Sequence, residues 1–346
     1  MKTRLLEFDY MRAVTIILIV LGHSVYNSGK GFPLLLENLL RGGTAVFVFI
    51  SGFFLHAIFA KRFEYRAFVL KKIQNVYVPF LFVSSVGLLS LIAIWVFRDH
   101  LPAERVGINV FHTVKNFYVL YPHWYIPFIM VVFLLTPLFL VYLKRPVKVQ
   151  IILLVAASLL AMFVHRPHGN VNVMHSIVYY TPYYLLGMLF SLYNAWFLRH
   201  KKAVLMVSLV LVASMLVAQT YIWVWVGNSH KDFFEFRGVD LQFIQKVGLC
   251  FILLALCQYW AQERPEMPRL KEVGNISFAI FFIHPLFTLL INVVSPLLGV
   301  KQINGGPLLS IAMTAVMFCI MFYGSIYVTR IVRAAFPGKS RWLIGA

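Results

Sequence analysis

Charged residues are scarce in this 346-residue chain: 12% are Asp, Glu, Lys or Arg, whereas 61% are hydrophobic. Soluble domains have about a quarter of their residues charged, so the composition excludes an ordinary water-soluble protein. Apolar runs of about 20 residues, the length that crosses a bilayer, recur along the whole sequence. We therefore expect residues 1–346 to form one integral-membrane domain without a separate soluble domain.

Cysteine is scarce as well, and its spacing argues against a structural role. Cys250, Cys257 and Cys319 lie inside apolar runs without a CxxC pair, so neither disulfides nor a thiolate metal site is expected. The His residues form no HExxH pattern, and the apolar runs hold almost no carboxylates, so we predict no metal. Without a soluble basic domain, nucleic acid is not an expected partner.

The apolar runs are continuous and rich in Leu, Ile, Val and Phe, which is typical of membrane helices and not of alternating barrel strands. We predict an all-α polytopic membrane bundle of about ten transmembrane helices. The expected spans lie near residues 9–28, 44–60, 73–97, 124–143, 149–164, 175–198, 203–226, 241–261, 275–298 and 307–329.

Lys and Arg are distributed unevenly among the predicted loops. With the N-terminus inside, the inner segments hold 20 of the 31 Lys and Arg residues, and the outer loops hold nine. Cytoplasmic loops retain positive charge, so both termini are predicted to be cytoplasmic. The net charge of +19 therefore lies mainly on the inner face, where it attracts anionic lipid headgroups or a polyanionic cofactor.

Two ionisable residues, Arg12 and His23, lie in the first predicted span. Eleven helical steps of about 100° return His23 to within about 20° of Arg12, about 16 Å further along, so one cleft could touch both. Ionisable groups in hydrocarbon are costly and are functional candidates by default. A structural interpretation stays open, in which Arg12 reaches the headgroups beside Asp9 and His23 bonds a neighbouring helix.

The pattern of Asp9, Arg12 and His23, with ten residues between the last two, resembles the first-helix motif of membrane acyltransferase family 3. Members of this family acylate cell-surface glycans. Three further stretches resemble the family in order and spacing: Phe47 to Phe54 with Ser51 and Gly52, the step His123, Trp124 and Tyr125, and Ser277 through His284 and Pro285. Short exopolysaccharide-locus members, such as those that modify poly-N-acetylglucosamine, are the most similar.

The resemblance implies a transmembrane O-acyltransferase in the bacterial cytoplasmic (inner) membrane. It would move an acyl group from cytoplasmic acyl-CoA to a hydroxyl of a cell-surface or lipid-linked polysaccharide, in exopolysaccharide biosynthesis and biofilm formation. Acetyl-CoA is the expected donor and succinyl-CoA the alternative; polysaccharide synthase or export proteins are expected partners. A polysaccharide or lipid-linked sugar transporter or flippase, or a non-catalytic synthase subunit, stays open, although internal repeats and membrane-buried carboxylates are not evident.

On this resemblance, His23 is the general base for the acceptor hydroxyl or a transient acyl carrier. Arg12, grouped with Asp9, orients the donor. The positive charges of Arg66, Lys71 and Lys72 could attract the phosphates of CoA, or could simply follow the positive-inside rule. Where the family often has two arginines three apart, this chain has Lys72 and Asn75, so bidentate phosphate binding is not expected there.

Four further residues are candidates with open alternatives. Glu37 is the predicted carboxylate that orients His23, and His284 is a substrate contact or a packing residue. Trp124 is either a platform that stacks on a sugar ring or an aromatic anchor in the membrane interface. Lys246 is expected to extend to the membrane surface in preference to binding the acceptor.

Overall fold

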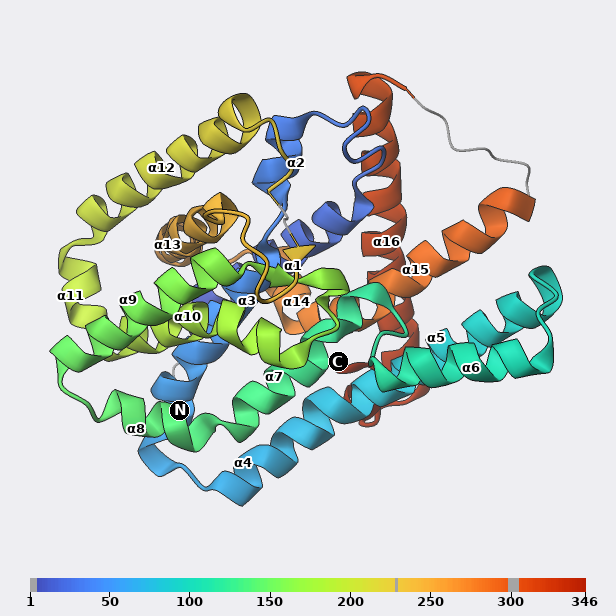
Figure 1. Cartoon of the computed structure of the whole chain (residues 1–346). Helices are drawn as coiled ribbons and strands as arrows, with labels where there is room; N and C mark the ends of the chain where they lie inside the picture. The colour runs from blue at the N-terminus through green and yellow to red at the C-terminus, as the bar shows by residue number, and fades with distance from the viewer. Residues whose placement is uncertain (1–4, 228–229, 298–304) are drawn as a thin grey trace.

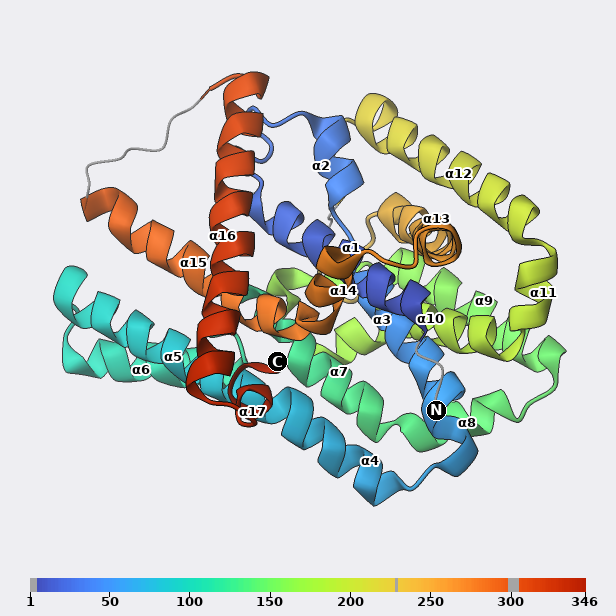
Figure 2. The same cartoon turned by 180° about the vertical axis from the view of Figure 1, so that it is seen from behind.

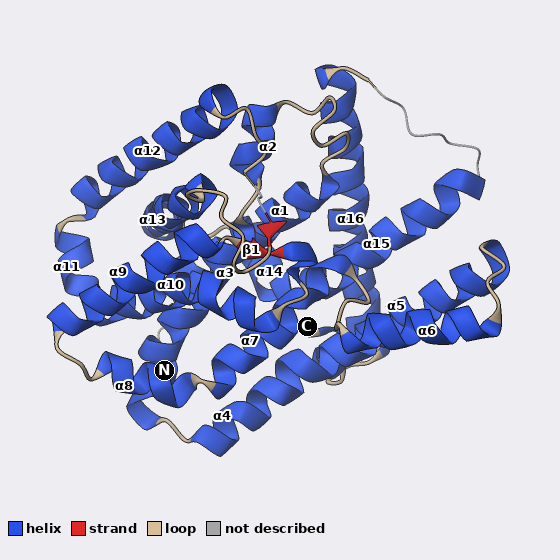
Figure 3. Ribbon diagram, in the orientation of Figure 1, coloured by secondary structure: helices blue, strands red, loops and turns tan. Residues whose placement is uncertain are grey.

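A computed structural model describes residues 5–227, 230–297 and 305–346, which are almost entirely helical (Figure 3). The longer helices are α1 (Leu6–Ser24), α3 (Gly43–Phe54), α5 (Val78–Ala93), α6 (Ala103–Lys115), α7 (Tyr125–Leu134), α9 (Val147–Val164), α10 (Val173–Leu192), α12 (Lys201–Val217), α13 (Leu241–Glu263), α15 (Ser277–Leu297) and α16 (Pro307–Ala335). The shorter ones are α2 (Leu34–Leu40), α4 (Tyr65–Lys72), α8 (Thr136–Leu143), α11 (Asn194–Arg199), α14 (Pro268–Asn275) and α17 (Ser340–Ile344). Two short strands, β1 (Arg166–Pro167) and β2 (His230–Lys231), pair in parallel.

Each of the ten predicted ranges overlaps a helix, and π-helical turns lengthen several of them. Such turns at Leu55–Phe59, Ile73–Tyr77 and Ile94–Arg98 help to make Leu34–Arg62 and Tyr65–Arg98 long helical stretches. Among the described residues, seven helices are long and apolar enough to cross a membrane, or eight when Tyr121–Leu134 and Thr136–Leu143, bent by 55°, form one span. The all-α, multi-pass membrane class is therefore supported, while the count of ten and the orientation of the termini stay predictions.

The helices separate into an inner and an outer group. Figures 1 and 2 show α1, α3, α10 and α13 in the interior, with α12, α16 and the α5–α6 pair at the periphery. The apolar window of α9 is only 17% buried and those of α12 and α16 are 28% buried, compared with 56% for α13. The outer helices thus present broad apolar faces of the kind that hydrocarbon, and not water, accommodates.

The closest crossing of the interior joins α3 and α10 through two reciprocal glycines. A Cβ atom at Gly52 would lie 2.0 Å from the carbonyl oxygen of Tyr184, and one at Gly187 would lie 2.0 Å from that of Phe49. Small residues at helix crossings let the two backbones approach closely in a membrane protein. This crossing fixes the stretch of α3 around Ser51 beside the candidate site.

Helix α1 lies at the centre of the bundle and packs against α3, α13, α14, α15 and α16. Its interior face is fully buried, with Tyr10, Met11, Ala13 and Ile16 completely inaccessible. Because α1 is enclosed along its length, its residues Arg12 and His23 both line internal cavities. Arg12 lies near its first turn and His23 in its last.

Candidate active site

Helix α1 borders two chambers, one near each end. The His23 chamber, of about 310 Å³, is lined in part by His23, Arg41, Trp124, Tyr125, Arg166 and Lys246. The Arg12 chamber, of about 780 Å³, is lined in part by Arg12, Lys71, Lys72, Asn75, Arg333 and Arg341. The single cleft expected to touch both Arg12 and His23 is therefore wrong: the two residues line different cavities.

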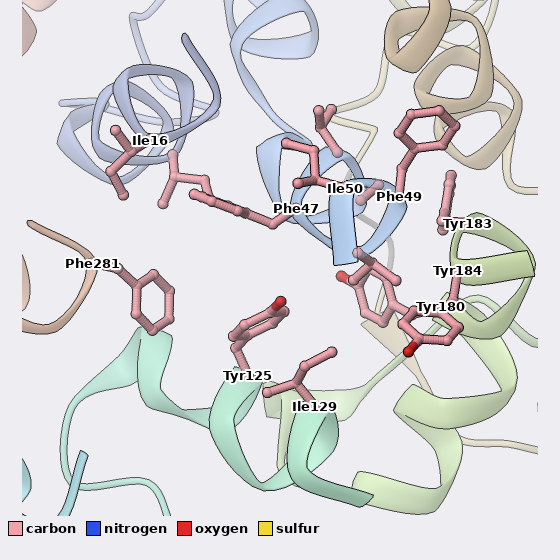
Figure 4. Packing of buried hydrophobic residues seen from close by; sticks show 14 of the residues in the cluster. Ile16, Phe47, Phe49, Ile50, Tyr125, Ile129, Tyr180, Tyr183, Tyr184 and Phe281 are labelled. Carbon is pink, nitrogen blue, oxygen red and sulfur yellow. The ribbon is translucent and has the colours of Figure 1, made fainter. Parts of the chain in front are cut away.

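A thin aromatic wall separates the two chambers. Tyr125 and Phe281 line the His23 chamber with ring centroids 5.5 Å apart, while Phe47 and Ser51 line the Arg12 chamber. Ser51 is a hydrogen-bonding neighbour of the Tyr125 side chain. Figure 4 shows Phe47, Tyr125 and Phe281 extending from α3, α7 and α15 toward one region. About one layer of side chains thus lies between the cavities.

His23 and His284 form a hydrogen-bonded pair between α1 and α15. His23 Nδ1 lies 3.0 Å from His284 Nε2, and the rings stack with an interplanar angle of 9°. His284 Nδ1 lies 2.9 Å from the carbonyl oxygen of Ile280. A carbonyl only accepts, so His284 Nδ1 carries a proton, its Nε2 accepts, and His23 Nδ1 must donate. Neutral His23 therefore has its lone pair on Nε2.

This pair places a basic nitrogen in the His23 chamber. His23 lines the chamber and is half-buried, whereas His284 is completely buried behind it. No described residue hydrogen-bonds His23 Nε2, so this atom can take a proton from a bound molecule. His284 is therefore placed to hold the His23 ring in position. The sequence had suggested only a substrate contact or a packing residue at His284.

The prediction that Glu37 orients His23 is wrong. Glu37 is fully buried and its carboxylate binds Arg41, with Nε at 3.0 Å, and Ser28. His23 Nδ1 is already occupied by His284, and no hydrogen bond joins Glu37 to the His23 ring in the described part of the chain. Glu37 instead fixes Arg41, which follows α2 directly and lines the His23 chamber.

Arg166 lies in β1, far from His23 in the sequence, and lines the His23 chamber. Its guanidinium lies 5.8 Å from the centroid of the Trp124 ring, and its backbone pairs with His230 of β2. Burial and the positive charge of Arg166 lower the pKa of His230 to about 3, so His230 stays neutral beside Arg166.

Two residues near Arg166 differ from their sequence-based interpretations. Trp124 is 6% exposed and stacks on Tyr180 with centroids 5.5 Å apart, so it is not an anchor in the membrane interface. Lys246 is 1% exposed and lines the chamber, so it does not extend to the membrane surface. Both side chains instead belong to the wall around His23.

The Arg12 chamber gathers positive charge from three parts of the chain. Arg12 pairs with Asp9 at 3.5 Å and lies 4.6 Å from the Phe54 ring centroid. Lys72 Nζ lies 4.4–5.2 Å from the rings of Phe59, Phe68 and Phe133. Asp9 is thus placed beside Arg12 and about 21 Å along the helix from His23.

The sequence-based set of donor-binding residues is partly brought together. Lys71 and Lys72 line the Arg12 chamber, whereas Arg66 is exposed and does not line it. Arg333 of α16 and Arg341 of α17 line the chamber and were missed, because their charge was attributed only to the positive-inside rule. The described residues contain no group of three His, Cys, Asp or Glu side chains that could hold a metal.

Comparison with known proteins assigns the chain to a family. Residues 5–330 match the family model of an acyltransferase domain, that of acyltransferase family 3. The match extends from the start of α1 into the last turns of α16, so it includes Arg12, His23 and His284. No curated protein and no solved structure matches the chain. The protein therefore belongs to acyltransferase family 3 and is a membrane acyltransferase.

Proposed function

We propose that the protein transfers an acyl group from acyl-CoA, bound at the Arg12 chamber, to a polysaccharide hydroxyl at the His23 chamber. The observation that carries this proposal is the chain of hydrogen bonds from Ile280 through His284 to His23. It leaves a lone pair on His23 Nε2 at the chamber wall. The same helix carries Arg12 into the second, cationic chamber.

The proposed reaction forms one ester bond and breaks one thioester bond. His23 Nε2 accepts the proton of the acceptor hydroxyl while that oxygen attacks the thioester carbonyl. The carbon–sulfur bond then breaks, and the proton passes from His23 to the departing CoA thiolate. In the alternative route, His23 Nε2 attacks the thioester and CoA leaves as the thiolate. The acceptor oxygen then attacks the acyl group, the bond to Nε2 breaks, and the hydroxyl proton passes to the CoA thiolate. His284 holds the imidazole in the required tautomer on either route.

The Arg12 chamber suits a polyanionic donor such as CoA. Its walls carry Arg12, Lys71, Lys72, Arg333 and Arg341. Guanidinium groups bind phosphates bidentately, which an ammonium cannot do. Arg333 and Arg341 therefore supply, from the end of the chain, the chemistry that Lys72 and Asn75 lack.

The wall between the chambers separates the proposed donor site from the proposed base. On either route the thioester carbonyl must reach His23, as the target of the acceptor oxygen or of Nε2 itself, so the thioester must cross the wall that contains Tyr125 and Phe281. We infer a cell-surface or lipid-linked glycan as acceptor in the bacterial inner membrane, with acetyl as the expected group and synthase or export proteins as partners. A transporter would not need a positioned imidazole base.

The function and its donor site are tested together with purified protein reconstituted in lipid. Acetyl-CoA and glycan should yield CoA thiol and glycan ester in equal amounts. Arg341→Gln should raise the KM for acyl-CoA about 10- to 100-fold, because a charge-assisted hydrogen bond contributes about 1.5–3 kcal/mol. The turnover number should stay unchanged, since Arg341 does not line the chamber that contains His23.

The matched control is Arg199→Gln, which removes an exposed arginine of α11 that lines neither chamber. Its kinetics should equal those of the unmodified protein. The proposed function is overturned if neither acetyl-CoA nor succinyl-CoA yields a glycan ester. An unchanged KM in the Arg341 variant would remove this residue from the donor site.

A further inference from the structure

The wall of the His23 chamber carries three cations. Arg41, Arg166 and Lys246 line it together with His23, whereas no described Asp or Glu side chain does. Arg41 and Arg166 are near enough for their charges to act on His23, and both also act on Lys246. A neutral sugar hydroxyl does not require so much positive charge.

Lys246 is the least expected of the three. It is 1% exposed, and its ammonium donates a hydrogen bond to no described residue. Its aliphatic stem lies over Gly42, where a Cβ would come 2.3 Å from Cε and where φ is +118°, so glycine makes room for this side chain. A buried ammonium without a hydrogen-bond partner is costly unless a counter-charge joins it.

The acid nearest to Lys246 is already saturated with donors. Asp240 accepts from the Tyr179 hydroxyl at 2.8 Å and from the backbone N–H groups of Gln242 and Phe243 at 2.9 and 3.1 Å. This acid caps α13 and does not line the chamber. Removal of Lys246 would therefore leave Asp240 with three hydrogen bonds.

The two arginines are held in place from behind. Glu37 binds Arg41 from outside the chamber lining, and the Trp124 ring lies beside the Arg166 guanidinium. Positively charged groups that are fixed before binding lose little conformational entropy when an anion arrives. The chamber is thus organised for negative charge next to the proposed base.

We propose that the His23 chamber binds a fully charged anionic group, a carboxylate or a phosphate, carried by one of the two substrates. The inference rests on the proposed function and specifies its substrate class. The anion has two candidate sources: the distal carboxylate of a dicarboxylic acyl group, or an acidic or phosphorylated sugar of the acceptor. Lys246 and Arg166 bind it while His23 activates the hydroxyl.

The test combines glycan analysis with the variant Lys246→Met. Mass spectrometry of the surface polysaccharide from cells producing the unmodified protein should find an ester in which the acyl group or the modified sugar is anionic. A dicarboxylic half-ester identifies the donor as the source, and an acidic or phosphorylated sugar identifies the acceptor. With purified protein, Lys246→Met should raise the KM for that charged substrate about tenfold and leave the turnover number within about twofold.

Lys246→Arg keeps the charge and should retain the KM within about threefold, whereas Lys30→Met, at an exposed lysine, should change nothing. An ester formed from a neutral acyl group on a neutral sugar overturns the inference but keeps the proposed function. A lower turnover number at unchanged KM also overturns it, because the lysine would then stabilise only the reaction's transient oxyanion. No ester at all overturns the proposed function itself.

Discussion

His23→Ala is expected to lower the turnover number for acyl transfer by about 10³-fold, with little change in the KM for acyl-CoA. A positioned general base contributes about 10²–10⁴-fold to a rate, and no other described imidazole lines the chamber. The proposed donor site at the Arg12 chamber is untouched by the change. The measurement is glycan-dependent release of CoA thiol by the reconstituted protein.

His284→Gln distinguishes orientation of His23 from bulk packing. The amide can still accept a hydrogen bond from His23 Nδ1, but both of its polar atoms lie at the end of the side chain, so neither replaces the Nδ1 donor that bonds Ile280. We expect a loss of about 10–100-fold in the turnover number at constant KM. His112→Ala, at an exposed histidine of α6, should behave like the unmodified protein. Full activity of a folded His23→Ala protein would contradict the assigned chemistry.

Gly187→Ala is expected to destabilise the protein by about 3 kcal/mol, a large loss for one methyl group. The new Cβ would lie 2.0 Å from the carbonyl oxygen of Phe49 and 2.9 Å from the backbone nitrogen of Phe53. These are backbone atoms, so α3 and α10 must separate. The measurement is the midpoint of thermal unfolding in detergent, followed by the loss of monodisperse protein.

Gly107→Ala is the matched control, because a Cβ at this position in α6 meets no atom within 4 Å. Here the same substitution should stabilise the helix by up to about 1 kcal/mol, since Gly is a poorer helix former than Ala. If Gly187→Ala lowers the stability of the protein and Gly107→Ala raises it, the α3–α10 crossing, and not helix propensity, controls the effect at Gly187. Equal midpoints would contradict a tight α3–α10 crossing.

The helices could be predicted from the sequence because hydrophobic runs are a local property. All ten predicted ranges overlap helices, and the range 241–261 matches α13 (Leu241–Glu263) closely. The 55° bend at Leu135 and the short helices α2, α14 and α17 could not be predicted. They are set by packing between distant segments, which leaves no periodic pattern in one stretch of sequence.

Only those parts of the candidate site that lie on one helix could be predicted from the sequence. Arg12 and His23 are ionisable residues in one apolar run, so their position on α1 follows from helix geometry. The partner of His23 is 261 residues away, and no spacing rule indicates such a contact. Arg41 and Arg166 could have been identified as candidate site residues from the sequence. Both lie in loops predicted to be outside, and the positive-inside rule accounts only for cations in the inner loops.

Cysteine labelling tests most directly the proposal that the acyl group crosses the membrane, which requires the Arg12 chamber to open to the cytoplasm and the His23 chamber to the outside. Val25→Cys places a thiol in the His23 chamber and Asn75→Cys places one in the Arg12 chamber, each in a protein whose three native cysteines are replaced by alanine. A membrane-impermeant maleimide should label position 25 in intact cells and position 75 only in inside-out vesicles. Labelling of both positions from one side would contradict transfer across the membrane.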